Sequence, residues 1–335
     1  MPTVASEPRP ASSADSGPLL AVESLTVTFA TRRGVVRAVD GISYVLEAGR
    51  TLGVVGESGC GKTVTALALL GLVDPPGKIS GGRVMFEGRD LLALDETAME
   101  GVRGARIAMI FQEPMTALNP VYTIGDQIGE VFTTHRGHSR GQARDGAVDM
   151  LERVGMPAPA RRARDYPHQL SGGMRQRAMI AMALAGRPAL LIADEPTTAL
   201  DVTVQAQILE LMLDIQDSFG TAIQFISHDL GVISEIADEV AVMYAGRIVE
   251  HAPADVIFDN PLHPYTQGLL ATVPRIGAGL DRLPAISGNV PDLARLPAGC
   301  AFRDRCPKAG PDCAVAPPLD IAEPGHRVAC FRVAR

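Results

Sequence analysis

The sequence contains no tryptophan, and aromatic residues make up only 4% of its 335 positions. Aromatic platforms on which nucleic-acid bases stack are therefore not expected. Acidic residues outnumber basic ones, and the formal net charge of −7 argues against non-specific binding to nucleic acid. An uninterrupted apolar run of about 18 residues, which a membrane-spanning helix requires, is also missing. The longest candidate, residues 178–193, is broken by Arg187 and Pro188.

Cysteine is nearly absent before residue 300, where only Cys60 occurs. The N-terminal segment lacks the apolar stretch of a secretory signal, so we expect a cytosolic chain whose thiols stay reduced. The other four cysteines are clustered near the end: Cys300, Cys306, Cys313 and Cys330. In a reduced compartment such a cluster predicts metal or iron–sulfur ligands before disulfides.

Composition divides the chain into segments. Apolar residues make up 46% of the sequence, which is enough to bury a sizeable core. Residues 1–18 are rich in proline, serine and alanine and are predicted to be a disordered tail. Residues 19–255 are predicted to form the main domain. After residue 255 proline, cysteine and turn residues dominate, so residues 256–335 are predicted to form a small further module.

The main domain alternates between two kinds of pattern. Short β-branched runs near its start predict antiparallel strands. Continuous apolar runs that end in polar residues or glycine then alternate with helical stretches, which predicts an α/β fold with a parallel sheet covered on both faces. Ligands bind such sheets at the carboxyl ends of the strands. The apolar runs are residues 51–55, 189–193, 222–226 and 240–244, and a mostly helical insertion is predicted for about residues 116–187.

Residues 56–63 fit the phosphate-binding pattern GxxxxGK[ST] between a predicted strand and a predicted helix. The glycines let backbone N–H groups close around a polyphosphate, and the helix N-terminus adds partial positive charge. We expect Lys62 to reach the β- and γ-phosphates of ATP and Thr63 to ligate Mg²⁺. The rest of the predicted phosphate loop is Gly56, Glu57, Ser58, Gly59, Cys60 and Gly61.

Two adjacent carboxylates end the apolar run at residues 189–193. Asp194 is predicted to hold Mg²⁺, directly or through water. Glu195 is predicted to act as the general base for the attacking water. The alternative for Glu195 is a solvated surface side chain.

Residues 170–177 resemble the LSGGQ signature of ABC ATPases, with Met174 at the position usually filled by glutamine. The resemblance implies an ABC-type P-loop NTPase with a RecA-like parallel sheet core, an antiparallel β subdomain and a helical subdomain. In that family the signature, here Ser171, Gly172 and Gly173, contacts ATP bound on a partner subunit.

Further motifs match the family in order along the chain. Gln112 resembles the Q-loop residue that senses Mg²⁺ and the attacking water. Residues 198–201, ending in Asp201, resemble the D-loop, and His228 resembles the switch histidine that contacts the γ-phosphate. Phe29 aligns with the aromatic residue that stacks on adenine, although a core strand residue is a comparable interpretation.

Residues 260–270 resemble the NPxHPYT segment of oligopeptide and dipeptide importer ATPases, and residues 166–169 and 119–120 are also typical of that subfamily. The resemblance implies an ATP-hydrolysing subunit that energises peptide uptake, bound peripherally to the cytoplasmic face of the cell membrane. The implied partners are two transmembrane permease subunits, a second ATPase subunit, expected to be a paralogue, and an extracytoplasmic solute-binding protein. Importers of nickel or another small solute share these features and remain an alternative.

The cysteine spacing lacks the CxxC pairs typical of structural zinc sites. Because the subfamily can carry a [4Fe–4S] cluster in this region, the resemblance implies that Cys300, Cys306, Cys313 and Cys330 bind one. Zinc is the alternative, with free thiols or disulfides as a third.

Three soluble ABC ATPase classes compete with a transporter subunit. A DNA-repair or chromosome ATPase needs long coiled-coil or zinc-hook insertions, and an iron–sulfur assembly ATPase lacks the NPxHPYT tail. A translation factor needs two nucleotide domains, whereas this chain has one GxxxxGK[ST] loop.

Overall fold

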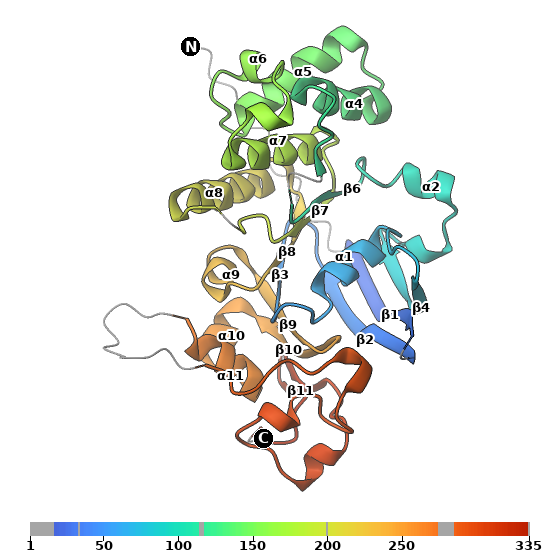
Figure 1. Cartoon of the computed structure of the whole chain (residues 1–335), viewed down its shortest axis with the longest axis vertical. Coiled ribbons are helices and arrows are strands. Elements are labelled where there is room, and N and C mark those ends of the chain that lie inside the picture. Colours follow the sequence, from blue (N-terminus) through green and yellow to red (C-terminus); the bar gives the residue numbers. More distant parts are fainter. Residues whose placement is uncertain (1–16, 33, 114–116, 199, 274–284, 334–335) are drawn as a thin grey trace.

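The computed structural model of the chain describes residues 17–32, 34–113, 117–198, 200–273 and 285–333. The disordered tail predicted for residues 1–18 therefore lies almost wholly outside the described residues. Figure 1 shows a helical region at one end of the long axis, a central sheet with an antiparallel sheet beside it, and the C-terminal segment at the other end.

The central sheet has eight strands in the order β11-β12-β10-β9-β3-β8-β7-β6. Strands β6 to β9 and β3 run parallel and are almost completely buried, because helices and the second sheet cover their faces. The parallel sheet predicted from the apolar runs is thus confirmed. Its strands are β3 (Thr51–Val55), β6 (Ile107–Ile110), β7 (Leu190–Asp194), β8 (Ala222–Ser227) and β9 (Glu239–Tyr244), followed by the antiparallel β10 (Arg247–Pro253), β11 (Asp320–Glu323) and β12 (His326–Val328).

The second sheet is antiparallel, with strand order β2-β1-β4-β5, as the β-branched runs near residue 19 predict. Long strands alternate buried and exposed side chains, so one face of this sheet packs on the core. The strands are β1 (Leu20–Thr31), β2 (Gly34–Leu46), β4 (Gly77–Phe86) and β5 (Arg89–Asp90).

The predicted helical insertion is confirmed by α4 to α7, which gather at the top of Figure 1. Their starts are set by side-chain caps: Thr123 caps α4, Ser139 forms a capping box with Gln142 of α5, and Ser171 caps α7. The helices are α1 (Lys62–Leu69), α2 (Glu96–Glu100), α4 (Ile124–Arg136), α5 (Arg140–Arg153), α6 (Pro159–Arg162), α7 (Gly172–Ala185), α8 (Val202–Phe219), α9 (Leu230–Ile236), α10 (Ala254–Asp259) and α11 (Pro264–Ala271).

Two hydrophobic clusters form the core. One joins one face of the central sheet to the helical region and extends to Tyr265 and Phe302 near the C-terminus. The other lies between the opposite face of the sheet, α1 and the antiparallel sheet. The central sheet therefore positions its strand ends between two packed layers, where side chains at those ends are held firmly.

The structure does not support the cysteine-rich module predicted for residues 256–335 as a unit apart from the main domain. Strand β12 pairs with β10, placing Val328 opposite Glu250 and Arg327 opposite His251, so the C-terminal segment extends the central sheet. After α10 and α11, the described residues outside β11 and β12 are in loops and in the short 3-10 turns η3 (Leu293–Arg295), η4 (Arg303–Arg305) and η5 (Pro311–Ala314). Within the described ranges, every helix is too short or too polar to cross a membrane.

Candidate active site

The glycine-rich turn at residues 56–61 connects the buried end of β3 to the first residue of α1. Gly56 and Gly61 both have positive φ, at 157° and 105°. A Cβ atom would lie 2.2 Å from the Met243 carbonyl oxygen at Gly56 and 2.3 Å from the Ala38 carbonyl oxygen at Gly61. Only glycine therefore fits at these two positions, and their conformation gives the tight turn that a phosphate-binding loop requires.

Lys62 is folded back into this loop. Its side chain is buried, with 5% of the residue exposed, and Nζ donates to the carbonyl oxygens of Gly56 at 2.6 Å and Glu57 at 3.2 Å. Helix α1 has no side-chain cap and no acidic residue in its first turn. The loop thus concentrates one ammonium charge and the positive end of a helix dipole, which suits a polyphosphate.

Asp194 ends β7, two strands away from β3 in the sheet. It is 1% exposed, and its Oδ1 atom has no hydrogen-bond partner among the described residues. Burial raises the pKa of Asp194, while a hydrogen bond from the Thr63 side chain acts in the opposite direction. A buried carboxylate oxygen without a partner, next to a hydroxyl, is the donor set that Mg²⁺ accepts, so Asp194 and Thr63 fit the predicted metal.

The Glu195 carboxylate contacts three polar side chains, two of them from distant parts of the sequence. Its Oε2 atom accepts hydrogen bonds from Gln112 Nε2 at 3.1 Å and Thr198 Oγ1 at 2.9 Å, and Oε1 lies 3.2 Å from His228 Nδ1. Burial acts to raise the pKa of Glu195, but hydrogen bonds from Thr198 and His228 outweigh it and hold the pKa below its usual range. The group is therefore a carboxylate at neutral pH, ready to accept a proton.

The backbone at Glu195 is itself unusual, because φ is 46° at a residue that is not glycine. Its N–H donates to the Ile226 carbonyl oxygen at 2.9 Å, which fixes the turn at the end of β7. Such strain is tolerated where the surrounding structure demands one side-chain direction, and here it turns the carboxylate toward Gln112 and His228.

Other predicted residues lie elsewhere. Ser171 is the N-cap of α7 and accepts from the Met174 N–H at 3.4 Å, and Figure 1 places α7 in the helical region, apart from α1. Asp201 caps α8 by accepting from the Val204 N–H at 2.9 Å. Phe29 lies in β1 against Gly77, where a Cβ atom would come within 2.5 Å of its ring. Their contacts with nucleotide, including those of Gly172 and Gly173, stay predictions.

The sequence did not indicate the contacts that four further residues make around the site. Thr198 donates to Glu195, a contact that its place in the predicted D-loop at residues 198–201 does not reveal. Tyr244, Tyr265 and Arg305 surround Glu57 of the phosphate loop, and no local pattern could have linked them to it.

The four clustered cysteines are free thiols. Burial raises the pKa of Cys300, and the nearby thiols of Cys313, Cys330 and Cys306 raise it further. Yet within the described parts of the chain, no three His, Cys, Asp or Glu side chains are arranged to hold a metal ion. The structure therefore gives no support to the predicted [4Fe–4S] cluster or to its zinc alternative.

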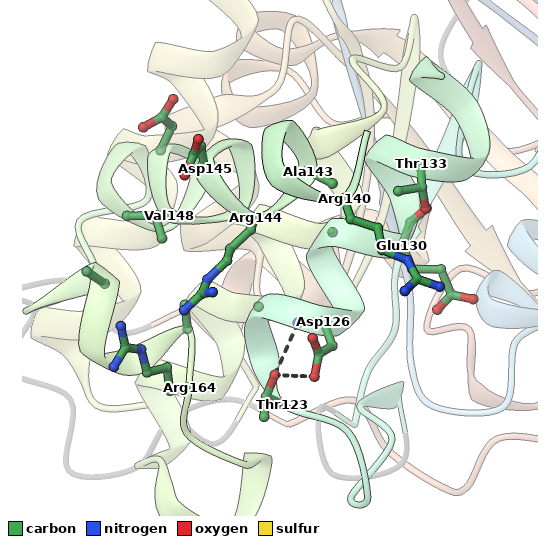
Figure 2. Close-up of a pocket in the computed structure, with 15 residues that line it drawn as sticks. Thr123, Asp126, Glu130, Thr133, Arg140, Ala143, Arg144, Asp145, Val148 and Arg164 are labelled. Carbon is green, nitrogen blue, oxygen red and sulfur yellow. Dashed lines mark hydrogen bonds between the residues drawn. The ribbon is translucent and has the colours of Figure 1, made fainter. Parts of the chain in front are cut away.

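A large cavity lies in the helical region, outside the phosphate site. Its volume is about 880 Å³, and α4, α5 and α6 line it with residues of both charges. Figure 2 shows Arg144 and Arg164 extending into the hollow, while Thr123 and Asp126 meet at its edge, where Thr123 Oγ1 donates to Asp126 Oδ2 at 2.6 Å.

Comparison with protein families gives two matches. Residues 39–198 match the ABC transporter family, and residues 249–313 match the oligopeptide/dipeptide transporter C-terminal region. The chain is 52% identical to the oligopeptide transport ATP-binding protein OppD of Salmonella typhimurium and to that of Escherichia coli, covering 94% of this chain and 93% of each relative. It is also 52% identical to a putative peptide import ATP-binding protein of Brucella abortus, over 94% of this chain and 97% of that protein.

Solved structures share the fold. The dimeric bacterial ABC transporter cassette MJ0796 superposes with a TM-score of 0.64 at 24% identity, covering 70% of this chain and 98% of the cassette. The protein cbiO1 from Clostridium perfringens, part of the ABC transporter complex cbiONQ, gives a TM-score of 0.62 at 25% identity and covers 72% and 91%. The predicted ABC-type fold is confirmed.

Proposed function

From the premise that this chain belongs to the ABC transporter family, we propose that it is the ATP-hydrolysing subunit of a peptide importer. The single observation that carries the ATPase assignment is the cluster of Gln112, Glu195 and His228, which follow the ends of β6, β7 and β8 on one side of the phosphate-loop strand β3. The peptide assignment is supported by the oligopeptide/dipeptide match at residues 249–313 and by relatives named for peptide import.

We propose a division of labour within the site. The loop at residues 56–61 and Lys62 bind the phosphates of ATP, and Thr63 and Asp194 hold Mg²⁺, which supplies charge neutralisation when bound. Glu195 takes a proton from the attacking water, and His228 and Gln112 orient that water and the γ-phosphate. Catalysis then rests on positioning and on electrostatic stabilisation of the transferred group.

Uptake of a labelled oligopeptide tests this assignment in cells that carry the complete transporter. Lys62→Ala should abolish uptake, because the phosphate loop loses its only side-chain cation. Lys78→Ala is the matched control, since Lys78 is exposed on β4. Unchanged peptide uptake in Lys62→Ala would contradict the proposal. Loss of nickel uptake with normal peptide uptake would favour the alternative solute.

We propose further that the chain works at the cytoplasmic face of the membrane with two permease subunits, a second ATPase subunit and an extracytoplasmic solute-binding protein, and that nucleic acid is not a partner. The cavity of Figure 2 is the proposed binding site for a cytoplasmic loop of a permease subunit. Val121 and Tyr122 support this, because they are 71% and 56% exposed beside Thr123 at its edge. In the sequence they lie between Gln112 and the first residue of α4.

Co-purification with the permease subunits tests this surface. Val121→Asp should prevent co-purification while the isolated chain still binds ATP. Val35→Asp is a close control, since Val35 is 70% exposed but lies on the antiparallel sheet. Equal co-purification of the two variants would contradict the docking surface.

The cysteine cluster carries a separate proposal, that Cys300, Cys306, Cys313 and Cys330 ligate a [4Fe–4S] cluster. It rests on the sequence, in which four of the five cysteines fall between residues 300 and 330, and not on an arrangement of their thiols in the structure. Protein prepared without oxygen should contain about four iron atoms per chain, and Cys306→Ser should lose them. Stoichiometric zinc would favour the alternative, and finding neither metal would remove both.

A further inference from the structure

Glu57, the second residue of the phosphate loop, is held by two side chains from the C-terminal part of the chain. Its backbone N–H donates to the Tyr265 hydroxyl at 2.8 Å. Its carboxylate accepts two hydrogen bonds from the Arg305 guanidinium, with Nη1 2.6 Å from Oε2 and Nη2 3.0 Å from Oε1. Arg305 is 248 residues away in the sequence, so this contact is purely tertiary.

Arg305 is built into its place. Only 5% of its side chain is exposed, and its Nε donates to the Ser287 carbonyl oxygen at 3.0 Å. The guanidinium lies over the rings of Tyr244 and Phe302, 5.8 and 5.9 Å from their centroids. A buried arginine with a bidentate carboxylate partner and aromatic faces has one geometry, so it fixes the direction of the Glu57 side chain.

The contact extends to the catalytic lysine. The Glu57 carbonyl oxygen accepts from Lys62 Nζ at 3.2 Å, so one residue joins Arg305 on one side to Lys62 on the other. Glu57 also carries a negative charge inside a loop that binds a polyphosphate, which would repel the ligand if it stood alone. The Arg305 guanidinium pairs with both oxygens of that carboxylate and so neutralises its charge.

We propose that Arg305 and Tyr265 are positioning residues for the phosphate loop, which set ATP affinity by holding and neutralising Glu57. The inference rests on the proposed ATPase function and adds to it a role for the C-terminal segment. The segment thereby acts on the nucleotide site without touching the nucleotide.

Affinity for a fluorescent ATP analogue, measured on the full-length chain, tests the inference. Arg305→Ala should weaken binding about tenfold, because it leaves an unpaired carboxylate in the loop. Glu57→Gln should bind nearly as the parent does. The double variant Arg305→Ala/Glu57→Gln should recover most of the lost affinity, since the unpaired charge is gone. Loss of a merely structural contact would not be rescued in this way.

Arg332→Ala is the matched control, because Arg332 forms an ion pair with Asp312 at 2.6 Å within the same segment. It should leave ATP affinity unchanged. Tyr265→Phe removes one oxygen and should weaken binding about twofold to threefold, as loss of one neutral hydrogen bond implies. If Arg305→Ala lowers the folded fraction, Arg305→Gln, which removes the positive charge but keeps a polar side chain, and Tyr265→Phe carry the test, and unchanged affinity in both would overturn the inference.

Two further outcomes distinguish a failure of the positioning role from a failure of the proposed ATPase function. A double variant as weak as Arg305→Ala would overturn the positioning role. A parent chain that binds no ATP analogue would instead overturn the proposed ATPase function, whatever the variants do.

Discussion

The strand ends of the central sheet and the C-terminal segment hold their side chains in place by different kinds of contact. At the strand ends, Asp194 and Glu195 are fixed by a buried parallel sheet within a few residues of where they occur in the sequence. The C-terminal segment has two short strands, and a buried carboxylate ties it down: Glu250 accepts from His326 Nε2 at 2.8 Å and from the His263 N–H at 3.0 Å. In the first region the regular sheet fixes the side chains, whereas in the second region hydrogen bonds between residues far apart in the sequence fix the segment.

The largest expected effect falls on the strand ends. Glu195→Gln should keep ATP binding and lower turnover of the assembled transporter about 10²- to 10⁴-fold, because the general base is lost while the hydrogen-bonding shape is kept. Glu210→Gln, on the exposed face of α8, is the control and should turn over normally. Near-normal hydrolysis by Glu195→Gln would show that rigid strand ends hold no catalytic base here.

A second prediction tests whether the helical region completes the site of another subunit. Ser171→Arg should lower turnover about a hundredfold, since a bulky charge at the start of α7 misplaces the ATP held between two subunits. ATP affinity at Lys62 of the same chain should be unchanged. Ser139→Arg also removes a helix N-cap, at α5, and should leave turnover intact. An equal loss of affinity and turnover in Ser171→Arg would contradict the shared site.

A third prediction concerns the buried histidine that joins the C-terminal segment to the sheet. Burial lowers the pKa of His263 to about 3, whereas the unfolded chain takes up a proton near pH 6.5. The unfolded state therefore binds more protons between these values, and the free energy of unfolding falls as pH drops from about 6.5 toward 3. The loss at pH 5 is on the order of 2 kcal/mol.

Urea unfolding at pH 7 and pH 5 measures this loss. His263→Asn is the control, because asparagine can replace the Nδ1 atom that accepts from the Tyr265 N–H at 3.0 Å but does not titrate. Its stability should fall less between the two pH values. An identical fall in both proteins would show that His263 is not the source of the acid sensitivity.

The smallest expected effect concerns the aromatic contacts of the C-terminal segment. The Phe302 ring lies 5.2 Å from Tyr244 and 5.4 Å from Tyr265, centroid to centroid. Phe302→Leu keeps an apolar side chain but loses these contacts, so the free energy of unfolding should drop by about 1 kcal/mol. Phe331→Leu, at a residue that is 42% exposed, should change little. Equal values for both variants would make the aromatic cluster dispensable.

What could be predicted from the sequence follows the same division. The phosphate loop, Asp194 and the strands beside them can be recognised in the sequence, because each motif lies directly at a strand end and its geometry is local. The contacts of Arg305 and Tyr265 with Glu57 could not be predicted, since Glu57 lies more than 200 residues away from both. The cysteines are a different case: residue type and spacing predict a metal site, but the described structure does not support one, because loop structure sets where thiols point and composition does not encode that.

The pairing of β12 with β10 has a consequence for anyone who shortens this chain. Without β12, the backbone amides and carbonyls of β10 at residues 250 and 251 would form an open sheet margin, next to the apolar side chains of Ile248 and Val249. Such a margin is a template for pairing with strands of other molecules. A nucleotide-binding fragment trimmed at residue 255 should therefore self-associate, and a soluble fragment needs its last strands or a charged substitute for them.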